Sequence, residues 1–237
     1  MRSLLMGGQA CVLYGGAEFS RDTDLVIVAD PDNLARLAAA AADLDAHPIA
    51  VPPFEKQFLD EGLAVHFRCQ ASGVAGMRLD VMSRVRGLAD FETLWQRRTT
   101  IDTGEQRIEV LSLPDLVTAK KTQRDKDWPM ITRLIEAHWT QTPRPAAEAA
   151  VDFWLRELRT PALLVRLAGD SPSAARRLVP QRPLLAAAVT GDEVEVARLL
   201  REEENRERDA DRLYWTPRRS RLESLRRELA DRRREPS

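Results

Sequence analysis

The sequence predicts an α/β (α+β) domain with a mixed β-sheet flanked by helices, followed by an all-helical C-terminal region. Strand and helix signals alternate up to about residue 112, and only helical signals follow. The polar, proline-rich segment 140–145 separates the two parts of the chain. We therefore expect one domain over residues 1–140 and a helical region with an Arg/Glu-rich end over residues 141–237.

The chain opens with a short apolar strand that runs straight into two glycines. The segment Arg2 to Met6 indicates a buried strand, and Gly7-Gly8 follows it directly. Residues 9–14 fit a short helix, which Gly15-Gly16 ends. We expect a strand that breaks at two glycines and then opens a helix.

The other strands of the first part are short apolar runs between turn residues. Residues 25–28, Leu-Val-Ile-Val, are bounded by Asp24 and by Asp30-Pro31, which indicates a buried strand followed by a helix start. Leucine and alanine at helical spacing predict that helix over residues 33–44. The same reasoning predicts strands at 64–69, 77–82 and 107–111.

Helices dominate the second part of the chain. Ser112 to Asp115 form a capping box with proline in the first turn, which predicts a helix through about Arg124 or beyond. From Arg201 onward the sequence is dense in Arg and Glu. This indicates a solvated helix with i,i+4 ion pairs and a frayed end, or an arm that binds RNA or a partner. Amphipathic helices are also predicted at 148–158, 163–167 and 184–200.

The composition argues against several classes of function. A formal net charge of −1 gives no overall attraction to nucleic acid or to a membrane surface. No apolar run reaches transmembrane length and no signal-peptide block opens the chain, so no membrane association is expected. Cys11 and Cys69 lie in apolar segments and are expected as buried free thiols in a reducing, cytoplasmic compartment. Zinc is not expected, because the three histidines show no Cys–His spacing.

Two aspartates separated by one residue are the main candidates for chemistry. Because side chains alternate along a strand, Asp22 and Asp24 are expected to point to the same face, about 7 Å apart. Held in this way they suit a hard divalent cation such as Mg²⁺, which takes oxygen ligands from one or two carboxylates, water and substrate phosphate. The alternative is an ordinary acidic turn before the strand at residues 25–28.

Asp80 is the candidate third acid. It is flanked by aliphatic residues within the predicted strand 77–82, and a carboxylate there is costly to bury without a partner. It would be a further metal ligand, or the base that helps to deprotonate an attacking hydroxyl. The alternative is a salt bridge to Arg78 or Arg84. His66, on the preceding strand, is expected to be packed or hydrogen-bonded rather than a ligand.

Gly7-Gly8 is a candidate phosphate cradle. A helix that opens at two glycines presents free backbone N–H groups, and the absence of side chains lets a triphosphate approach them closely. Most glycine pairs only mark turns, but this one is followed, after thirteen intervening residues, by Asp22-Thr23-Asp24. Arg21, beside the aspartates, either steers a phosphate or forms an ion pair with one of them, and both interpretations stay open.

In this order the motifs resemble the nucleotidyltransferase fold of the DNA polymerase beta superfamily. Its signature is an apolar residue, Gly and Gly/Ser, a spacer, Asp-x-Asp/Glu and a third acid on a later strand. The matching residues are Met6-Gly7-Gly8, Asp22-Thr23-Asp24 and Asp80. Thr23 stands where an aliphatic residue is more usual, although threonine favours strands.

Within the superfamily, the chain is similar to small bacterial nucleotidyltransferase-like proteins that include AbiEii-type toxins of type IV toxin–antitoxin systems. The similarity covers roughly residues 2–135. It implies that Lys120 lies near the nucleotide phosphates and that Lys126-Asp127 is the basic–acidic pair that follows. Lys120, Arg124 and Asp127 are expected along one helical face. The similarity rests on four sequence segments: Gly-Gly-Gln-Ala, Ser-Arg-Asp-Thr-Asp-Leu, Asp-Val-Met-Ser and Leu-Pro-Asp-Leu-Val-Thr-Ala-Lys-Lys.

The resemblance implies a nucleotidyltransferase-type sheet and a metal-dependent enzyme. The enzyme would transfer a nucleoside monophosphate from an NTP to an acceptor hydroxyl on RNA or tRNA, a protein or a small molecule. Mg²⁺ or Mn²⁺ would be its cofactor, and a cognate antitoxin would be a partner if the chain is a toxin. The alternative is a non-catalytic binding module that pairs with a toxin or antitoxin. The expected catalytic and metal-ligating residues are Asp22, Asp24 and Asp80, and the expected nucleotide-binding residues are Gly7, Gly8, Arg21, Lys120, Lys126 and Asp127.

Overall fold

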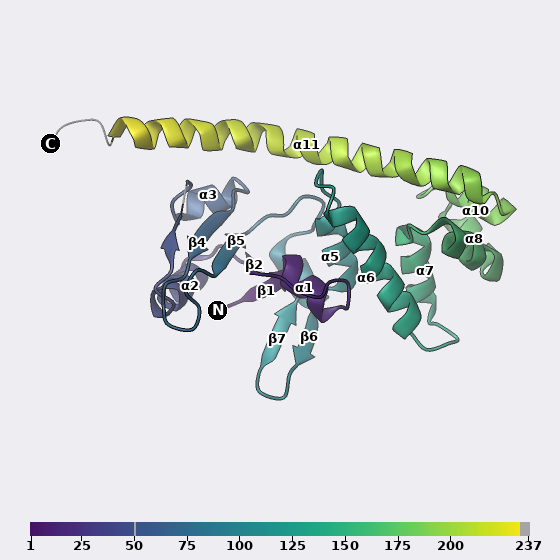
Figure 1. The fold of residues 1–237 in the computed structure, drawn as a ribbon, viewed down its shortest axis with the longest axis horizontal. Coiled ribbons are helices and arrows are strands. Elements are labelled where there is room, and N and C mark those ends of the chain that lie inside the picture. The colour runs from purple at the N-terminus through teal and green to yellow at the C-terminus, as the bar shows by residue number, and fades with distance from the viewer. Residues whose placement is uncertain (50, 233–237) are drawn as a thin grey trace. The chain divides into compact units, whose positions relative to one another are not determined.

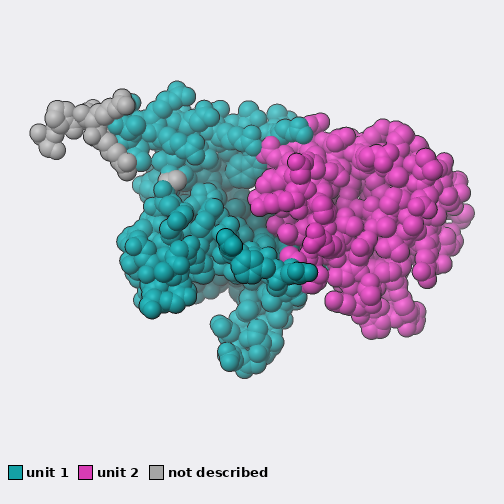
Figure 2. Space-filling model, in the orientation of Figure 1, with its two compact units in different colours: residues 1–13, 18–119, 212–237 teal, residues 14–17, 120–211 magenta. Residues whose placement is uncertain are grey.

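The computed structural model describes residues 1–49 and 51–232 of the 237-residue chain. It divides into two compact units (Figure 2). Unit 1 comprises residues 1–13, 18–119 and 212–237, and unit 2 comprises residues 14–17 and 120–211. The sequence predicts two domains with a boundary after residue 140. The division into compact units does not test that boundary, which stays a prediction.

Unit 1 is built on a mixed β-sheet, which confirms the predicted fold class (Figure 1). The described residues form seven strands in the order β3-β4-β5-β2-β1-β7-β6. The pairs β2–β5 and β1–β7 are parallel, and the remaining neighbours are antiparallel. The strands are β1 (Ser3–Met6), β2 (Asp22–Ile27), β3 (His47–Pro48), β4 (Val65–Arg68), β5 (Arg78–Met82), β6 (Thr99–Asp102) and β7 (Arg107–Val110).

One face of the sheet forms an apolar core. Alternate strand residues that point to this face, such as Ile27 and Val81, pack against Leu37 of helix α2 (Pro31–Asp43) and Leu59 of helix α3 (Lys56–Asp60). The predicted start of α2 is confirmed, because the Asp30 carboxylate caps the helix by accepting a hydrogen bond from the Asn33 N–H at 2.8 Å. Since side chains alternate, the strand residues between them face away from this core. The remaining helices of the sheet region are α1 (Gly7–Leu13), α4 (Phe91–Gln96) and α5 (Leu113–Lys120).

Helix α5 begins as predicted and ends earlier than predicted. The Ser112 hydroxyl accepts from the Asp115 N–H at 3.3 Å and donates to its carboxylate at 2.6 Å, which confirms the capping box. The helix ends at Lys120 and α6 begins at Asp127, so the prediction of one helix through Arg124 is wrong. The reason is that the Asp127 carboxylate accepts hydrogen bonds from the connecting residues and folds them into a tight loop.

The described residues of unit 2 form a helical assembly. Its helices are α6 (Asp127–Gln141), α7 (Glu148–Glu157), α8 (Pro161–Asp170), α9 (Pro172–Leu178), α10 (Leu185–Thr190) and residues 193–211 of α11 (Glu193–Arg232). The predicted helix 184–200 is broken at Gly191, whose φ of +80° ends α10 in the left-handed conformation. Within the described chain, no helix is both long and apolar enough to cross a membrane.

Helix α11 has the predicted i,i+4 ion pairs, but it is not solvated all round. Leu225 is buried against Val51, Phe58 and Leu63 of unit 1. Residues 233–237 lie outside the described residues, and the frayed end and the binding arm predicted for the segment from Arg201 onward stay predictions. The ion pairs are Arg198–Glu202, Arg208–Glu204 and Arg227–Glu223.

Both cysteines are free and buried, as predicted. Cys11 lies in α1 and Cys69 directly follows β4. Burial raises the pKa of the Cys69 thiol, which disfavours the reactive thiolate. Both residues therefore act as small apolar core residues.

Aromatic residues organise the core of unit 2. Trp154 is fully buried, and its ring centroid lies 4.8 Å from that of Trp139. The Trp154 indole N–H donates to Nδ1 of His138 at 2.9 Å. Burial lowers the pKa of His138 from its ordinary value of 6.5, so the folded chain resists protonation at this ring.

We predict that the free energy of unfolding falls as the pH drops below about 6.5. The unfolded chain takes up a proton at His138 there, whereas the folded chain does so only at a lower pH. His138→Asn keeps an acceptor for Trp154 but does not titrate, and it should flatten this part of the profile. Urea unfolding of both proteins between about pH 7 and pH 5 measures the difference. Identical slopes would contradict the prediction.

Candidate active site

The three predicted acids lie on one face of the sheet because β2 pairs in parallel with β5. The register sets Asp24 opposite Asp80 and Asp22 opposite Arg78. The antiparallel pairing of β4 with β5 adds His66 directly opposite Asp80. Asp22 and Asp24 are two residues apart within β2 itself, so the alternative of a simple acidic turn before the strand does not hold.

Asp80 is buried, with 8% of its surface exposed, and it has two strong partners. His66 Nδ1 lies 2.8 Å from one carboxylate oxygen, and the Arg78 guanidinium lies 3.0 Å from the other. The predicted alternative of a salt bridge to Arg78 is thus present in the structure. These two partners compensate the cost of burying the carboxylate.

The oxygen ligands of Asp22 and Asp24 suit a divalent cation, but a complete ligand group is not formed among the described residues. Asp22 and Asp24 supply two oxygen-ligand side chains on one strand face, which suits Mg²⁺ or Mn²⁺. Across residues 1–49 and 51–232, however, no three His, Cys, Asp or Glu side chains are grouped closely enough to hold a metal ion. Asp80 would join such a group only by exchanging its contacts with Arg78 or His66. The metal role of the three acids stays a prediction.

The glycine pair lets β2 approach the start of α1. Gly7 has a φ of +69°, and a Cβ atom placed on it would lie 1.9 Å from Oδ2 of Asp24. A Cβ atom on Gly8 would lie 2.3 Å from Oγ of Ser20, whose hydroxyl donates to the Asp22 carbonyl at 3.3 Å. The space above both glycines is therefore filled by the chain's own side chains. This packing requires glycine whether or not phosphates bind there.

Arg21 lies near an exposed aromatic ring. Its guanidinium is 6.0 Å from the ring centroid of Phe19, which is 70% exposed. In the described part of the chain, Arg21 forms no ion pair. The predicted ion pair with one of the aspartates is therefore not formed in the described residues, and the contact of Arg21 with a phosphate stays a prediction.

The predicted residues Lys120, Lys126 and Asp127 belong to unit 2. Asp127 is almost fully buried; its carboxylate lies 3.5 Å from Lys120 Nζ and accepts from Arg124 at 2.7 Å. The expectation of one helical face is wrong, because Lys120 ends α5 and Asp127 begins α6. The loop nevertheless brings Lys120 and Arg124 to the same carboxylate. The proposed contact of these residues with nucleotide phosphates stays a prediction.

The prediction that His66 is packed or hydrogen-bonded is confirmed, because its Nδ1 lies 2.8 Å from Asp80, although the sequence analysis did not identify this partner. Strand alternation could have found it, since His66 and Asp80 share a face if the strands at 64–69 and 77–82 pair in the observed register. Ser20 carried no sequence signal, because its contact with Gly8 depends on how the loop folds back.

No protein-family model matches the chain, and no curated protein matches it. Solved structures that resemble part of its fold include the following two. The lincosamide antibiotic adenylyltransferase LnuA, with bound lincomycin, is 13% identical over 56% of this chain and 85% of its own, with a TM-score of 0.38. An antigenic nucleotidyltransferase-like protein from Paracoccidioides brasiliensis is 20% identical over 80% of this chain and 84% of its own, with a TM-score of 0.38. At TM-scores this low, the activity of neither protein can be assigned to this chain.

We predict that Gly7→Ala destabilises the protein more than Gly73→Ala does. Both glycines have positive φ, so both variants bear the strain of an alanine in that region, about 1–2 kcal/mol. Only at Gly7 does the new methyl group also meet Asp24, which should add about 1–3 kcal/mol of overpacking. Urea unfolding measures both costs. Equal costs would show that the Asp24 contact is unimportant.

We further predict that Arg78 and Asp80 are energetically coupled. A double-mutant cycle with Arg78→Met and Asp80→Asn should give a coupling of about 0.5–3 kcal/mol in the free energy of unfolding. The matched control is the exposed pair Arg107–Asp102, 3.6 Å apart, which should give less than about 1 kcal/mol. The prediction fails if Arg78 and Asp80 couple no more strongly than Arg107 and Asp102.

Proposed function

We propose that the chain is a nucleotidyltransferase that moves a nucleoside monophosphate from an NTP to an acceptor hydroxyl. One observation carries the proposal: the β2–β5 register places Asp22, Asp24 and Asp80 on one face of the sheet. Gly7 stands directly beside Asp24, so the start of α1 borders the same acids. A group of acids on one face of strands whose other face forms the apolar core is a candidate for chemistry rather than for packing.

In this proposal the acceptor oxygen attacks the α-phosphorus of the NTP. A new phosphorus–oxygen bond forms, the bond to the β-phosphate breaks, and pyrophosphate leaves. Asp22 and Asp24 would hold Mg²⁺ or Mn²⁺, which supplies charge neutralisation when bound. Asp80, oriented by His66 and Arg78, would take the proton of the attacking hydroxyl. To serve instead as a third metal ligand, it would exchange one of these two contacts for the metal.

The proposed nucleotide contacts rest on the charge and the backbone groups present. Gly7 and Gly8 would offer the N–H groups at the start of α1 to the phosphates. Arg21, which has no ion-pair partner within the described residues, would add a positive charge. The assignment of Lys120, Lys126 and Asp127 as nucleotide-binding residues rests only on the resemblance to AbiEii-type proteins.

The acceptor and the biological setting are also part of the proposal. RNA or tRNA, a protein and a small molecule all carry the required hydroxyl, and the charge pattern favours none of them. The resemblance to AbiEii-type proteins supports a cytoplasmic toxin with a cognate antitoxin as partner. No other observation on the chain distinguishes this role from small-molecule modification.

A second candidate function is a non-catalytic binding module. Two contacts favour it: Asp80 is already bonded to Arg78 and His66, and Asp24 fills the space beside Gly7. A site closed by its own side chains can be a structural remnant. Thermal shift separates the candidates, because an NTP with Mg²⁺ or Mn²⁺ stabilises a protein that binds it, and no shift with any nucleotide would favour the module.

We predict that replacing Asp22 and Asp24 together by Ala abolishes label transfer from an α-labelled NTP to total cell extract. The loss should be at least about a hundredfold, because two groups that balance transition-state charge are removed. EDTA should have the same effect on the wild-type protein. Asp102→Ala, which removes an exposed acid from the same unit, is the matched control and should leave transfer unchanged. Transfer that survives the double substitution would contradict the mechanism.

A further inference from the structure

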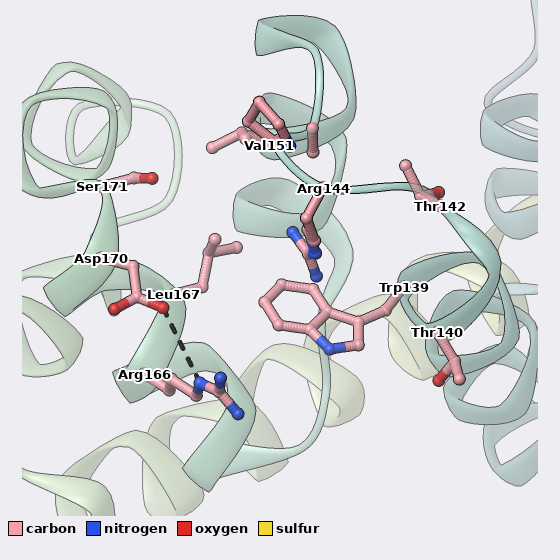
Figure 3. A pocket seen from close by; sticks show the side chains of 11 residues that line it. Trp139, Thr140, Thr142, Arg144, Val151, Arg166, Leu167, Asp170 and Ser171 are labelled. Atoms are coloured by element: carbon pink, nitrogen blue, oxygen red, sulfur yellow. Dashed lines mark ion pairs between the residues drawn. The ribbon is translucent and has the colours of Figure 1, made fainter.

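Unit 2 contains a cavity of about 570 Å³ whose lining includes none of the predicted site residues. It is formed by the C-terminal end of α6, the connection to α7 and the C-terminal end of α8. Figure 3 shows Trp139 and Arg144 on one side, with Leu167, Asp170 and Arg166 on the other. Its volume falls in the range of small-molecule sites, about 300–1,000 Å³.

Arg144 is a positioned cation at this cavity. Its guanidinium carbon lies 4.1 Å from the ring centroid of Trp139 and 4.5 Å from that of Trp154. Trp154 is fully buried and hydrogen-bonded to His138, so the aromatic platform is fixed. A guanidinium on an aromatic platform keeps N–H donors at its edge, which can bind a planar anion with two parallel hydrogen bonds.

Within the described residues, Arg144 has no carboxylate partner. A second cavity of unit 2, about 430 Å³, shows the contrast. There Arg159 and Arg208 lie over Trp128, but Arg159 pairs with Glu203 at 3.7 Å and Arg208 with Asp125 at 2.5 Å. The two arginines that lie over Trp128 are thus paired with carboxylates, whereas Arg144, which lies over Trp139 and Trp154, is not paired with one among the described residues.

The opposite wall is apolar and nearly neutral. Leu167 is buried at its base, and Val151 lines the same space. Arg166 is paired with Asp170 at 3.8 Å (Figure 3), so the charged lining groups sum to one positive charge in excess. A ligand that satisfies both walls needs one anionic group and one flat apolar part.

We propose that this cavity binds a small organic anion that carries one flat ring. Arg144 binds the anionic group, and the ring packs between Trp139 and Leu167. Mononucleotides and aromatic carboxylates share this chemistry. The proposal does not depend on nucleotidyl transfer, because none of the residues assigned to that reaction lines the cavity.

The test is a calorimetric titration of the full chain in EDTA, which removes divalent cations from the proposed active site. The probes are AMP and benzoate, with adenosine and inorganic phosphate as ligands that lack the charge or the ring. We expect AMP or benzoate to bind at least tenfold more tightly than adenosine and phosphate. Tighter AMP identifies a phosphate ligand, and tighter benzoate identifies a carboxylate ligand.

Variants locate the binding. Arg144→Gln should weaken it at least tenfold, while Arg144→Lys keeps the charge and should weaken it less. Arg133→Gln removes an exposed arginine from the same helix as Trp139 and should change nothing. Circular dichroism and the thermal midpoint confirm that each variant is folded.

Three results would overturn the proposal. The first is that neither AMP nor benzoate binds the wild-type chain. The second is that the Arg144→Gln variant binds the probe as tightly as the wild type, and the third is that binding is lost only in the double variant Asp22→Asn with Asp24→Asn. The last result would place the ligand at the β2 acids and leave the proposed transferase intact. If the wild-type chain showed no label transfer but bound the probe, the proposed transferase would fail and the cavity proposal would stand. The two proposals can therefore fail separately.

Discussion

The parallel pairing of β2 with β5 is the constraint on which the candidate site depends. Its register sets Asp24 opposite Asp80 and, by the same alternation, sends Ile27 and Val81 into the apolar core under α2. A shift of either strand by one residue would turn its aspartates into that core and expose its aliphatic residues. The free energy of core packing therefore also holds the acids together, although the acids repel one another.

Charge compensation decides how these acids can be kept in the folded chain. A buried carboxylate is tolerated when hydrogen-bonding or charged groups replace its water. Asp80 has Arg78 and His66, and Asp127 has Lys120 and Arg124. In both clusters the partners come from nearby strands or loops, so the acid also fixes local geometry. Asp127 shapes the loop between α5 and α6, and Asp80 ties β4 to β5.

The sequence analysis succeeded where one local signal decides the structure. Apolar runs located β2 and β5, and the capping box at Ser112 located the start of α5. It was wrong about the end of that helix, because Asp127 closes the loop through contacts that no local preference encodes. The acids of the site were predictable from strand alternation, whereas the contacts of Gly7 with Asp24 and of Gly8 with Ser20 appear only once β2 has folded back.

Arginine content alone says little in this chain, since 36 basic residues are balanced by 37 acidic ones. Many arginines of unit 2 are engaged with carboxylates, as Arg177 is with Asp152 and Arg182 with Glu203. Arg177 is exposed and its pair contributes little to stability, whereas Arg182 is buried and its partner is half-buried. Neither pair leaves a positive charge for a ligand. An arginine is informative when its position is fixed by something other than an acid. Arg144 meets this condition, because the indoles of Trp139 and Trp154 hold it while its charge stays uncompensated among the described residues.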